Sequence, residues 1–437
     1  MEKALFRNFV KYVSLNILGM VGISCYILAD TFYVSKALGA TGIAALNLSI
    51  SIYSVIHGIG LMIGIGGATR FSILKSRDKE KEANAVFLTS VMFGVFAGLI
   101  FVIVGIFGAE YLAMALGADS STLPLTKTYL GTILSFSPFF ILNNVMLAFV
   151  RNDDNPRLSM AAMLTGSFSN IILDYVFMFP LGMGMFGAAF ATGLAPIISI
   201  ALLMIHFIKK KGILEFHRSK FSWAPIPDLV GLGLSACINE VSSAVVLITF
   251  NLVILKLEGN MGVAAYGIIA NLALVGIAVF TGLAQGAQPL VSQFYGRKER
   301  MLLGKVRKYT LLSAILIAVI IYLGVLGYGD KIVEIFNSES NPEISRMAIT
   351  GLLIYFSGFL FAGVNITSAM LSSATENARD AFTISITRGI IIIVPLVLVL
   401  SSFLHMTGVW LAFLLTELIV TVIAISLAGV HRRSSGC

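Results

Sequence analysis

Charged side chains are scarce in this sequence. Lys, Arg, Asp and Glu make up 12% of the 437 residues, whereas hydrophobic residues make up 57%, and the mean hydropathy is +0.93. Soluble globular domains carry roughly 25% charged residues. The deficit runs along the whole length, and no stretch resembles a separate soluble domain. We therefore predict an all-α, polytopic membrane protein.

Cysteine is also rare, and several catalytic motifs are absent. The three cysteines, Cys25, Cys237 and Cys437, have neither metal-site nor disulfide spacing. No GxxxxGK[ST] loop and no HExxH motif occurs, which excludes ATP hydrolysis by this chain and argues against a membrane metalloenzyme. The net charge of +8 comes from short basic loops between apolar runs, so we expect no nucleic-acid partner. We expect no enzymatic activity and no cofactor.

Apolar runs of about 20 residues, the length of a membrane-spanning helix, recur along the chain. Twelve spans are predicted, at residues 9–34, 43–68, 84–108, 128–150, 158–179, 187–208, 228–255, 263–292, 308–328, 347–373, 381–402 and 405–429. With a cytoplasmic N-terminus, the inner segments hold 24 of the 30 Lys and Arg residues and the outer loops hold five. The remaining one, Arg388, lies inside a span. This positive-inside bias predicts that both termini are cytoplasmic and that the protein lies in the inner (plasma) membrane.

An internal repeat relates the two halves of the chain. The segment 38–53 aligns with 260–275 at an offset near 220, and at offset 220 Gly66 pairs with Gly286. At an offset of 222, "RNDDNPR" (151–157) aligns with "SATENAR" (373–379). Repeats in the same orientation predict two pseudo-symmetric six-helix lobes related by an axis along the membrane normal. We place the N-lobe at 1–208, a cytoplasmic linker at 209–227 and the C-lobe at 228–437.

Four acidic residues lie well inside predicted spans: Asp30, Asp174, Glu240 and Glu417. A charge at the bilayer centre costs on the order of 3 kcal/mol or more, so each is a functional hypothesis. Asp30 and Asp174 are predicted at the same depth, with Asn170 one helical turn from Asp174 and Thr192 at a similar level. This set suits Na⁺ or a shared proton. The alternatives are a helix-end role for Asp30 and a structural hydrogen bond for Asp174.

The second half contains fewer candidates. Glu240 would hold a proton or a cationic substrate. The alternative is that it is only a carboxylate solvated by the water of a cavity. Gln285 and Gln288, beside a helix-breaking Pro289, add polar groups to this candidate C-lobe site. For Glu417 we predict an inter-helix ion pair with Arg388. His57 is interpreted as a packing residue.

Several segments together resemble the multidrug and toxic compound extrusion (MATE) transporters, of the DinF-like or MepA-like type. They are "ADTFYVSKALGATGIAALNLSI", "RNDDNPR", "NIILDYVF" with "GAAFATGLAP", and "GVAAYGII" with "GLAQGAQPLVSQFYG". The resemblance covers nearly the whole chain and implies twelve helices in two lobes around a V-shaped cavity. It also implies cation-coupled efflux of bulky, often cationic, aromatic compounds.

The resemblance extends to a site. The family's first-lobe ion site is similar to Asp30, Asn170, Asp174 and Thr192. Glu240 matches the seventh-helix acid of another branch, but that branch's tenth-helix acid has no counterpart in "YFSGFLFAGVNITSAM".

These features predict an antiporter that exchanges H⁺ or Na⁺ for organic compounds and works as a monomer in lipid. The alternative within the superfamily is a flippase for lipids or lipid-linked oligosaccharides, which usually has more arginines facing its cavity. A receptor or scaffold would not need the first-lobe carboxylates or the repeat. An intramembrane enzyme would need a nucleophile and base, and no plausible pair is found.

Overall fold

The computed structural model describes residues 2–215, 222–336 and 341–434, and every regular element in these ranges is a helix. The helices are α1 (Glu2–Lys75), α2 (Glu80–Ala115), α3 (Leu123–Ser135), α4 (Ser137–Asn152), α5 (Pro156–Met178), α6 (Gly184–Ile208), α7 (Ile226–Gly296), α8 (Arg300–Phe336), α9 (Pro342–Ser357), α10 (Phe359–Ser373), α11 (Ala378–Ile386), the π-helix η1 (Thr387–Ile391) and α12 (Ile393–Ser434). Part of the predicted linker, residues 216–221, and Cys437 lie outside the described residues.

The described helices have the length and composition of membrane spans. Seven are long and apolar enough to cross a membrane, or nine if each of two bent helix pairs counts as one span. The pair α3–α4 bends by 49°, where Pro138 removes a backbone donor at the start of α4. Large apolar side chains such as Phe107 and Leu323 are exposed on the surface, as lipid contact requires. The predicted class, an all-helical membrane protein, is confirmed at this level.

The two longest helices each contain one non-helical glycine. Gly39 in α1 has φ 64° and ψ −153°, and Gly259 in α7 has φ 61° and ψ −150°. Residues with a Cβ adopt this backbone region only under strain. Each of the two glycines lies between two predicted spans, and the sequence repeat pairs them at its offset of 220. His405 breaks α12 in a related conformation, with φ 49° and ψ −133°.

Other unusual backbone positions recur with the spacing of the repeat. Asp78 and Lys298, which are related by the offset of 220, both have positive φ angles, of 58° and 60°. Asp154 and Glu376, which are related by the offset of 222, have φ angles of 64° and 58°. The residues that follow the second pair also correspond, because Asn155 caps α5 and Asn377 caps α11. The offsets found in the sequence therefore also relate the local geometry of the two halves.

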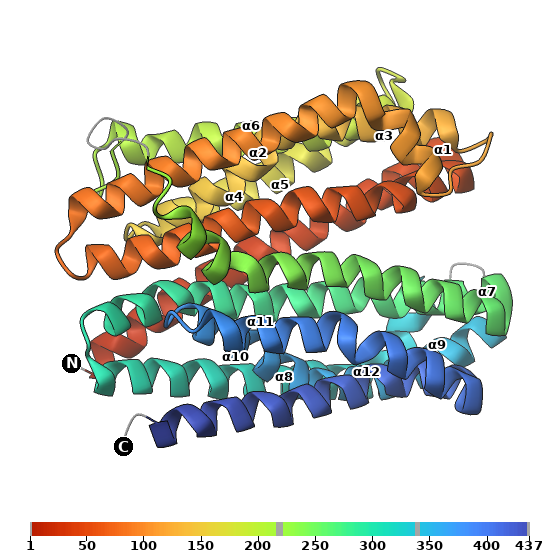
Figure 1. The fold of residues 1–437 in the computed structure, drawn as a ribbon. Helices are drawn as coiled ribbons and strands as arrows, with labels where there is room; N and C mark the ends of the chain where they lie inside the picture. Colours follow the sequence, from red (N-terminus) through yellow and green to blue (C-terminus); the bar gives the residue numbers. More distant parts are fainter. Residues whose placement is uncertain (1, 216–221, 337–340, 435–437) are drawn as a thin grey trace.

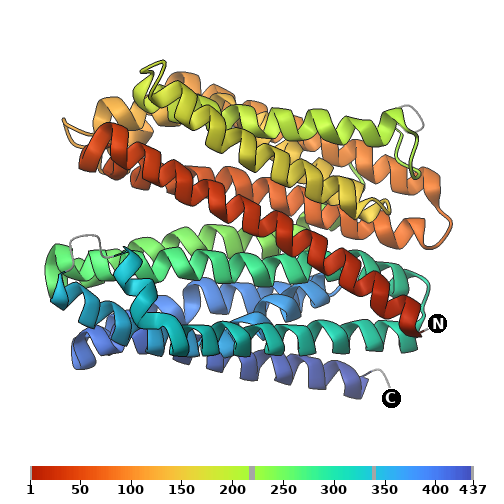
Figure 2. The same cartoon turned by 180° about the vertical axis from the view of Figure 1, so that it is seen from behind.

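The helices form two layers (Figures 1 and 2). Helices α2–α6 lie in one layer and α7–α12 in the other, while α1 begins beside the second layer and crosses to the first. The buried apolar residues follow this arrangement, with Phe71 and Phe149 in a first cluster and Phe359 and Trp410 in a second. A third cluster packs Phe9 of α1 among residues of α7, α8 and α10. The start of α1 and the end of α12 lie at the same end of the molecule, which we call the terminal end.

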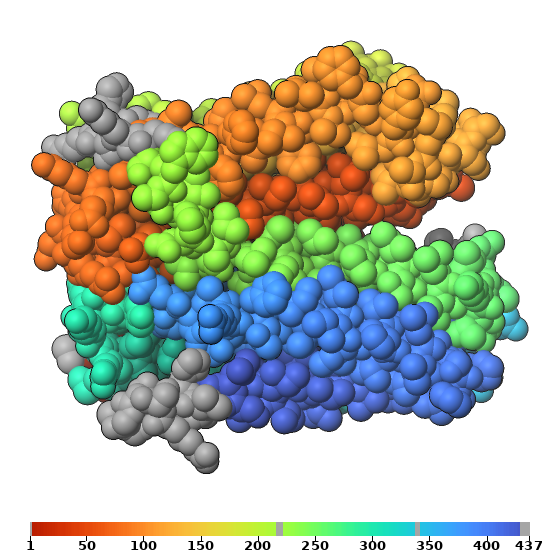
Figure 3. All heavy atoms as spheres, in the orientation of Figure 1, coloured from red at the N-terminus to blue at the C-terminus, as the bar shows by residue number. Residues whose placement is uncertain are grey.

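The two layers meet along α1 and α7 through glycines. A Cβ on Gly66 would collide with the carbonyl oxygen of Leu229, and a Cβ on Gly286 would lie 2.7 Å from the Cα of Val13. Because both glycines belong to the sequence repeat, each half contributes one equivalent contact. We call this set of contacts the glycine seam. Beyond it, at the end away from the termini, the space-filling view is hollowed between the layers (Figure 3).

Candidate functional site

Close packing of α1 against α5 brings Asp30 to the level of Asp174. A Cβ on Gly19 would lie 2.8 Å from the sulfur of Met163, and one on Gly22 would lie 2.6 Å from Leu164 Cδ2. Asp30 follows Gly19 by the same number of residues as Asp174 follows Met163, so the contact between Gly19 and Met163 implies that the two aspartates lie at the same level. The equal depth predicted for these two carboxylates is therefore present in the structure.

Asn170 and Thr192 join Asp174 in the interior of the first half. When the Asn170 amide is oriented to satisfy its neighbours, its nitrogen donates to Asp174 Oδ2 at 3.1 Å. Its oxygen then accepts from the backbone N–H of Thr192 at 3.2 Å. The amide thus connects α5 to α6 and holds one oxygen of the Asp174 carboxylate. The i, i+4 spacing of Asn170 and Asp174 indicates this shared face in the sequence.

Both carboxylates keep an oxygen without a partner. Asp30 is 7% exposed and Asp174 is 0% exposed, yet Asp30 Oδ1 and Asp174 Oδ1 accept no hydrogen bond from any of the described residues. The two groups are close enough for their charges to interact. Burying an unpaired carboxylate is costly unless it is neutralised. The geometry is therefore suited to receiving a cation or a proton.

Tyrosine hydroxyls lie near this cluster, and they were not predicted from the sequence. Tyr26 lies one helical turn before Asp30, and its hydroxyl is 3.0 Å from that of Tyr53. The Tyr129 hydroxyl on α3 lies beside the Thr192 side chain. The i, i+4 spacing of Tyr26 and Asp30 is a sequence signal that could have identified Tyr26. Tyr53 and Tyr129 come from other parts of the chain, and no local pattern indicates them.

Glu240 faces His57 across the two halves. His57 Nδ1 is 3.4 Å from Glu240 Oε1, and the two side chains are 19% and 32% exposed. The His57 ring stacks on Tyr53 with 5.8 Å between ring centroids and an interplanar angle of 13°. Next to this pair, Gly58 packs against Cys237 in the glycine seam. The interpretation of His57 as a packing residue is incomplete, because its ring also faces a carboxylate.

The structure does not bring Gln285 and Gln288 together with Glu240. Gln285 Oε1 accepts from Arg151 at 3.3 Å, and Gln288 Oε1 accepts from Asn152 at 2.9 Å. Both glutamines are buried, whereas Glu240 lies partly exposed beside His57. The predicted grouping is therefore corrected: the glutamines bind the motif of the first half and do not share a site with Glu240.

The motif "RNDDNPR" forms a junction at the terminal end. Arg151 is buried and donates to Asn16 Oδ1 at 2.8 Å as well as to Gln285. Asn16 in turn donates to the carbonyl oxygen of Gly282 at 3.0 Å. Asn152 donates to Gln288, as described above. The first two residues of the motif therefore bind the second half and the start of α1.

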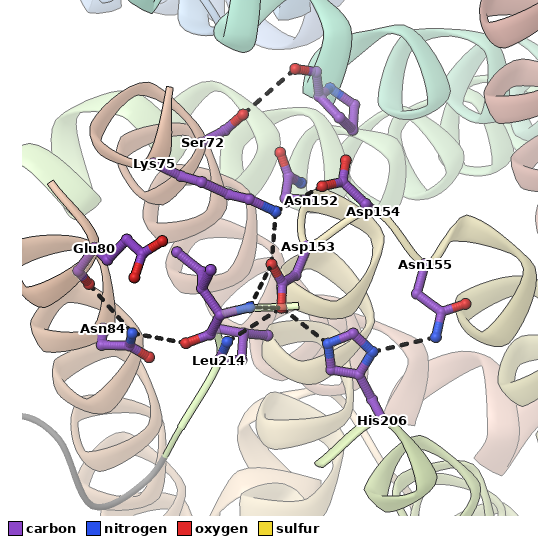
Figure 4. A network of polar contacts seen from close by, with 12 residues as sticks. Ser72, Lys75, Glu80, Asn84, Asn152, Asp153, Asp154, Asn155, His206 and Leu214 are labelled. Atoms are coloured by element: carbon purple, nitrogen blue, oxygen red, sulfur yellow. Dashed lines mark hydrogen bonds and ion pairs between the residues drawn. The ribbon is translucent and has the colours of Figure 1, made fainter. Parts of the chain in front are cut away.

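Asp153 of the same motif holds the start of the linker (Figure 4). Its buried carboxylate accepts from Lys75 Nζ at 2.6 Å, His206 Nε2 at 2.9 Å, and the backbone N–H groups of Ile213 at 2.9 Å and Leu214 at 3.1 Å. Burial opposes its ionisation, but the His206 hydrogen bond and the Lys75 charge outweigh burial and keep the pKa of Asp153 below its ordinary value. A cavity of about 230 Å³ lies beside this network, lined in part by Lys75.

Ion pairs join other elements. Arg70 Nη1 lies 2.5 Å from Glu376 Oε1, and Arg70 Nε lies 3.4 Å from Asp228 Oδ2, so this guanidinium connects α1 to two segments of the second half. Arg388 Nε lies 2.6 Å from Glu417 Oε1, which confirms the predicted inter-helix pair. Within the described residues, no group of three or more His, Cys, Asp or Glu side chains is placed to hold a metal ion.

Comparisons with known proteins agree over nearly the full length. The sequence model of the MatE family matches residues 16–176 and 236–399. The multidrug export protein MepA of Staphylococcus haemolyticus is 28% identical over 431 residues, which cover 97% of this chain and 93% of that protein. MepA of Staphylococcus saprophyticus is 26% identical with the same coverage, 97% and 93%. A solved structure described as an outward-facing multidrug resistance MATE family transporter superposes with a TM-score of 0.91 at 21% identity, covering 98% and 96% of the two chains.

Proposed function

The chain belongs to the MatE family, and on that premise we propose that it exports bulky, often cationic, organic compounds in exchange for H⁺ or Na⁺. The relatives named as multidrug export proteins support the export of organic compounds. The coupling to a cation is inferred from the first-half carboxylates. The organic compound and the coupling cation are both cargo of the transporter.

One observation supports this function most directly: two buried carboxylates that each keep an unpartnered oxygen, Asp30 Oδ1 and Asp174 Oδ1. In the part of the chain that the structure describes, no lysine or arginine pairs with either group. Carboxylate, amide and hydroxyl oxygens are ligands for a hard cation, and Asn170 and Thr192 supply the last two types. Two neighbouring carboxylates would equally share a proton. The residues present therefore fit either ion.

The cycle follows from the charge of this cluster. With the hollow between the layers open, the two carboxylates take up one cation, which lowers their combined negative charge from two to one. Cancelling one of the two charges reduces the cost of burying the pair, so α1 can pack more closely against α5 and α6 and displace the organic compound. After the protein opens on the other side, the cation leaves and the compound binds again. One charge moving through 100 mV supplies about 2.3 kcal/mol, and the two states must differ in cation affinity by a comparable amount.

The proposed topology has twelve spans with both termini in the cytoplasm. Three of the nine candidate spans contain a break, at Gly39 in α1, at Gly259 in α7 and at His405 in α12. If each of these three is counted as two spans, the total is twelve. The start of α1 and the end of α12 lie at the same end, which supports an even number of spans. We propose the N-lobe at 1–208, the linker at 209–227 and the C-lobe at 228–437, in a monomer of the plasma membrane.

We propose that Glu240 contributes to the substrate site of the second half. Its carboxylate is partly exposed, and His57 and Tyr53 provide flat rings next to it. A carboxylate beside aromatic rings suits an organic cation. The flippase alternative is less favoured, because Arg388 is already paired with Glu417 and is not free to bind phosphate.

The decisive experiment is efflux of a fluorescent organic cation, ethidium, from vesicles with separately imposed Na⁺ and pH gradients. Wild type should follow at least one gradient, and Asp30→Asn and Asp174→Asn should each abolish coupled efflux. Asp330→Asn, an exposed aspartate outside the cluster, is the matched control and should pump normally. If both cluster variants pump like wild type, the first-half site is wrong. If wild type moves no organic cation under either gradient, the flippase alternative replaces the efflux proposal.

A further inference from the structure

A second buried polar cluster lies in the other half, between α10, η1 and α12. Glu417 is 1% exposed, and its Oε1 is 2.6 Å from Arg388 Nε. Asn365 Nδ2 donates to Glu417 Oε2 at 2.7 Å and to the Glu417 carbonyl oxygen at 2.8 Å. Thr421 Oγ1 donates to Asn365 Oδ1 at 3.0 Å. We call these four residues the Arg388 cluster.

The Arg388 cluster contains the same ligand types as the first-half site. Each has a carboxylate, an asparagine amide and a threonine hydroxyl between packed helices. The difference is the source of positive charge. The first-half carboxylates keep unpartnered oxygens, whereas the guanidinium of Arg388 already neutralises Glu417.

One pair of corresponding helices contributes to the two clusters, at different depths. Helices α5 and α11 start after equivalent capping asparagines, Asn155 and Asn377. Asp174 lies near the far end of α5, whereas Arg388 lies in η1, which directly continues the short helix α11. At 1.5 Å per residue, Arg388 is about 12 Å nearer the terminal end than the equivalent of Asp174.

The backbone around Arg388 holds its side chain in place. Arg388 belongs to the π-helix Thr387–Ile391, and π-helical turns are often found at functional positions. At the next residue, a Cβ on Gly389 would collide with the Ser242 side chain of α7. This close approach fixes the rotation of η1 and keeps the arginine aimed at α12. A buried ion pair rarely stabilises a fold more than apolar packing of similar volume would, so the pair requires another explanation.

We propose that Arg388 acts as a tethered cation, so that the second half binds no coupling cation and the transporter exchanges cations only through its first half. Glu417, with Asn365 and Thr421 hydrogen-bonded beside it, then forms a latent cation site whose charge is already balanced by Arg388. This inference rests on the proposed cation coupling, because it assigns the coupling to one half. Removing the arginine charge would leave Glu417 as an unpaired buried carboxylate, and a mobile cation would replace the guanidinium.

The test is the number of cations bound by purified protein, measured as radioactive Na⁺ at high pH and as proton uptake on acidification. Arg388→Met should bind one more cation per molecule than wild type. The double variant Arg388→Met/Glu417→Gln removes both charges and should return to the wild-type number. Arg388→Lys keeps a tethered charge and should also match wild type. Correct folding is checked by gel filtration and by the melting temperature in detergent.

The outcomes separate this inference from the proposed function. If Arg388→Met binds no additional cation, the Arg388 cluster is only structural and the inference is overturned. If Arg388→Met aggregates, Arg388→Gln takes its place, and an unchanged number of cations in that folded variant has the same meaning. Failure of the first-half site appears elsewhere, as normal cation binding by Asp30→Asn and Asp174→Asn in an otherwise wild-type chain.

Discussion

Gly39 and Gly259 have nearly the same non-helical backbone conformation in the middle of the two longest helices, with φ 64°, ψ −153° and φ 61°, ψ −150°. A Cβ at either position would have open space, since no atom of the described residues, chain neighbours aside, lies within 4 Å. Sterics with neighbours therefore do not require glycine there, and only the backbone conformation does. The breaks let α1 and α7 each supply two of the proposed spans.

Gly259→Ala should destabilise the protein through backbone strain alone. The conformation costs a residue with a Cβ on the order of 1–3 kcal/mol, which should lower the melting temperature measured in detergent. Gly267→Ala is the control, because Gly267 is helical in the same helix and its added Cβ also meets open space. That control should be neutral or slightly stabilising. Equal melting temperatures for the two variants would show that the break at Gly259 is not strained.

Asp153→Asn should loosen the attachment of the linker and remove a pH dependence. The hydrogen bonds to the charged carboxylate suggest a loss of about 2 kcal/mol. The folded protein lowers the pKa of Asp153, so the stabilisation is complete above the unfolded value of about 4 and is lost as pH falls through the folded value. Melting temperatures measured from neutral to strongly acidic pH should fall at the acidic end in wild type and change less in the variant.

The control for this experiment is Asp154→Asn. Asp154 also pairs with Lys75, at 2.7 Å, but its side chain is 66% exposed. Exposed ion pairs contribute about 0–1 kcal/mol, so this variant should behave nearly as wild type. A larger effect at Asp154 than at Asp153 would contradict the proposed role of the buried carboxylate.

Arg70→Gln should favour opening at the terminal end. It removes the contacts with Glu376 and Asp228 that join α1 to the second half. A loss of about 1 kcal/mol would increase the open fraction roughly fivefold. The readout is the rate at which an impermeant maleimide labels Ser292→Cys, a buried position of α7 beside Gln288, in a cysteine-free background. Lys79→Gln, which breaks only an exposed pair with Glu82, should leave the labelling rate unchanged.

Glu240→Gln should weaken the binding of organic cations and spare neutral compounds. Losing one carboxylate partner in a partly exposed site costs about 1 kcal/mol, so the Kd for ethidium should rise roughly fivefold. Glu258→Gln, at an exposed position of the same helix, should not change it. Binding is measured by fluorescence titration. An equal loss of affinity for neutral and cationic compounds would mean that Glu240 shapes the site without pairing with charge.

The sequence predicted the parts of the site that depend on spacing within one helix or on depth in the membrane. Asn170 and Asp174 share a face because they are one helical turn apart, and Asp30 matches Asp174 in depth because their helices run in the same direction. The pair of Arg388 and Glu417 was predictable because each is an ionisable group that needs a partner inside the membrane.

The sequence did not predict contacts that depend on how helices are rotated and which halves meet. Gln285 was grouped with Glu240 because both are polar residues of one half, yet Gln285 faces Arg151 of the other half. The contact of His57 with Glu240 also crosses the halves. Helical rotation is set by the packing of many side chains, and a single sequence without aligned relatives does not specify it.

The glycine seam also has a consequence for the entropy of each transport cycle. A long side chain loses up to about 2 kcal/mol of rotamer freedom when it is buried, whereas glycine has none to lose. The contacts of Gly66 and Gly286 are made against the neighbouring backbone. Such a surface separates and closes again without reordering side chains at those points. In the proposed transport cycle, the few ionisable groups around the seam can then decide on which side the protein is open, so that binding of one proton or sodium ion is enough to change that side.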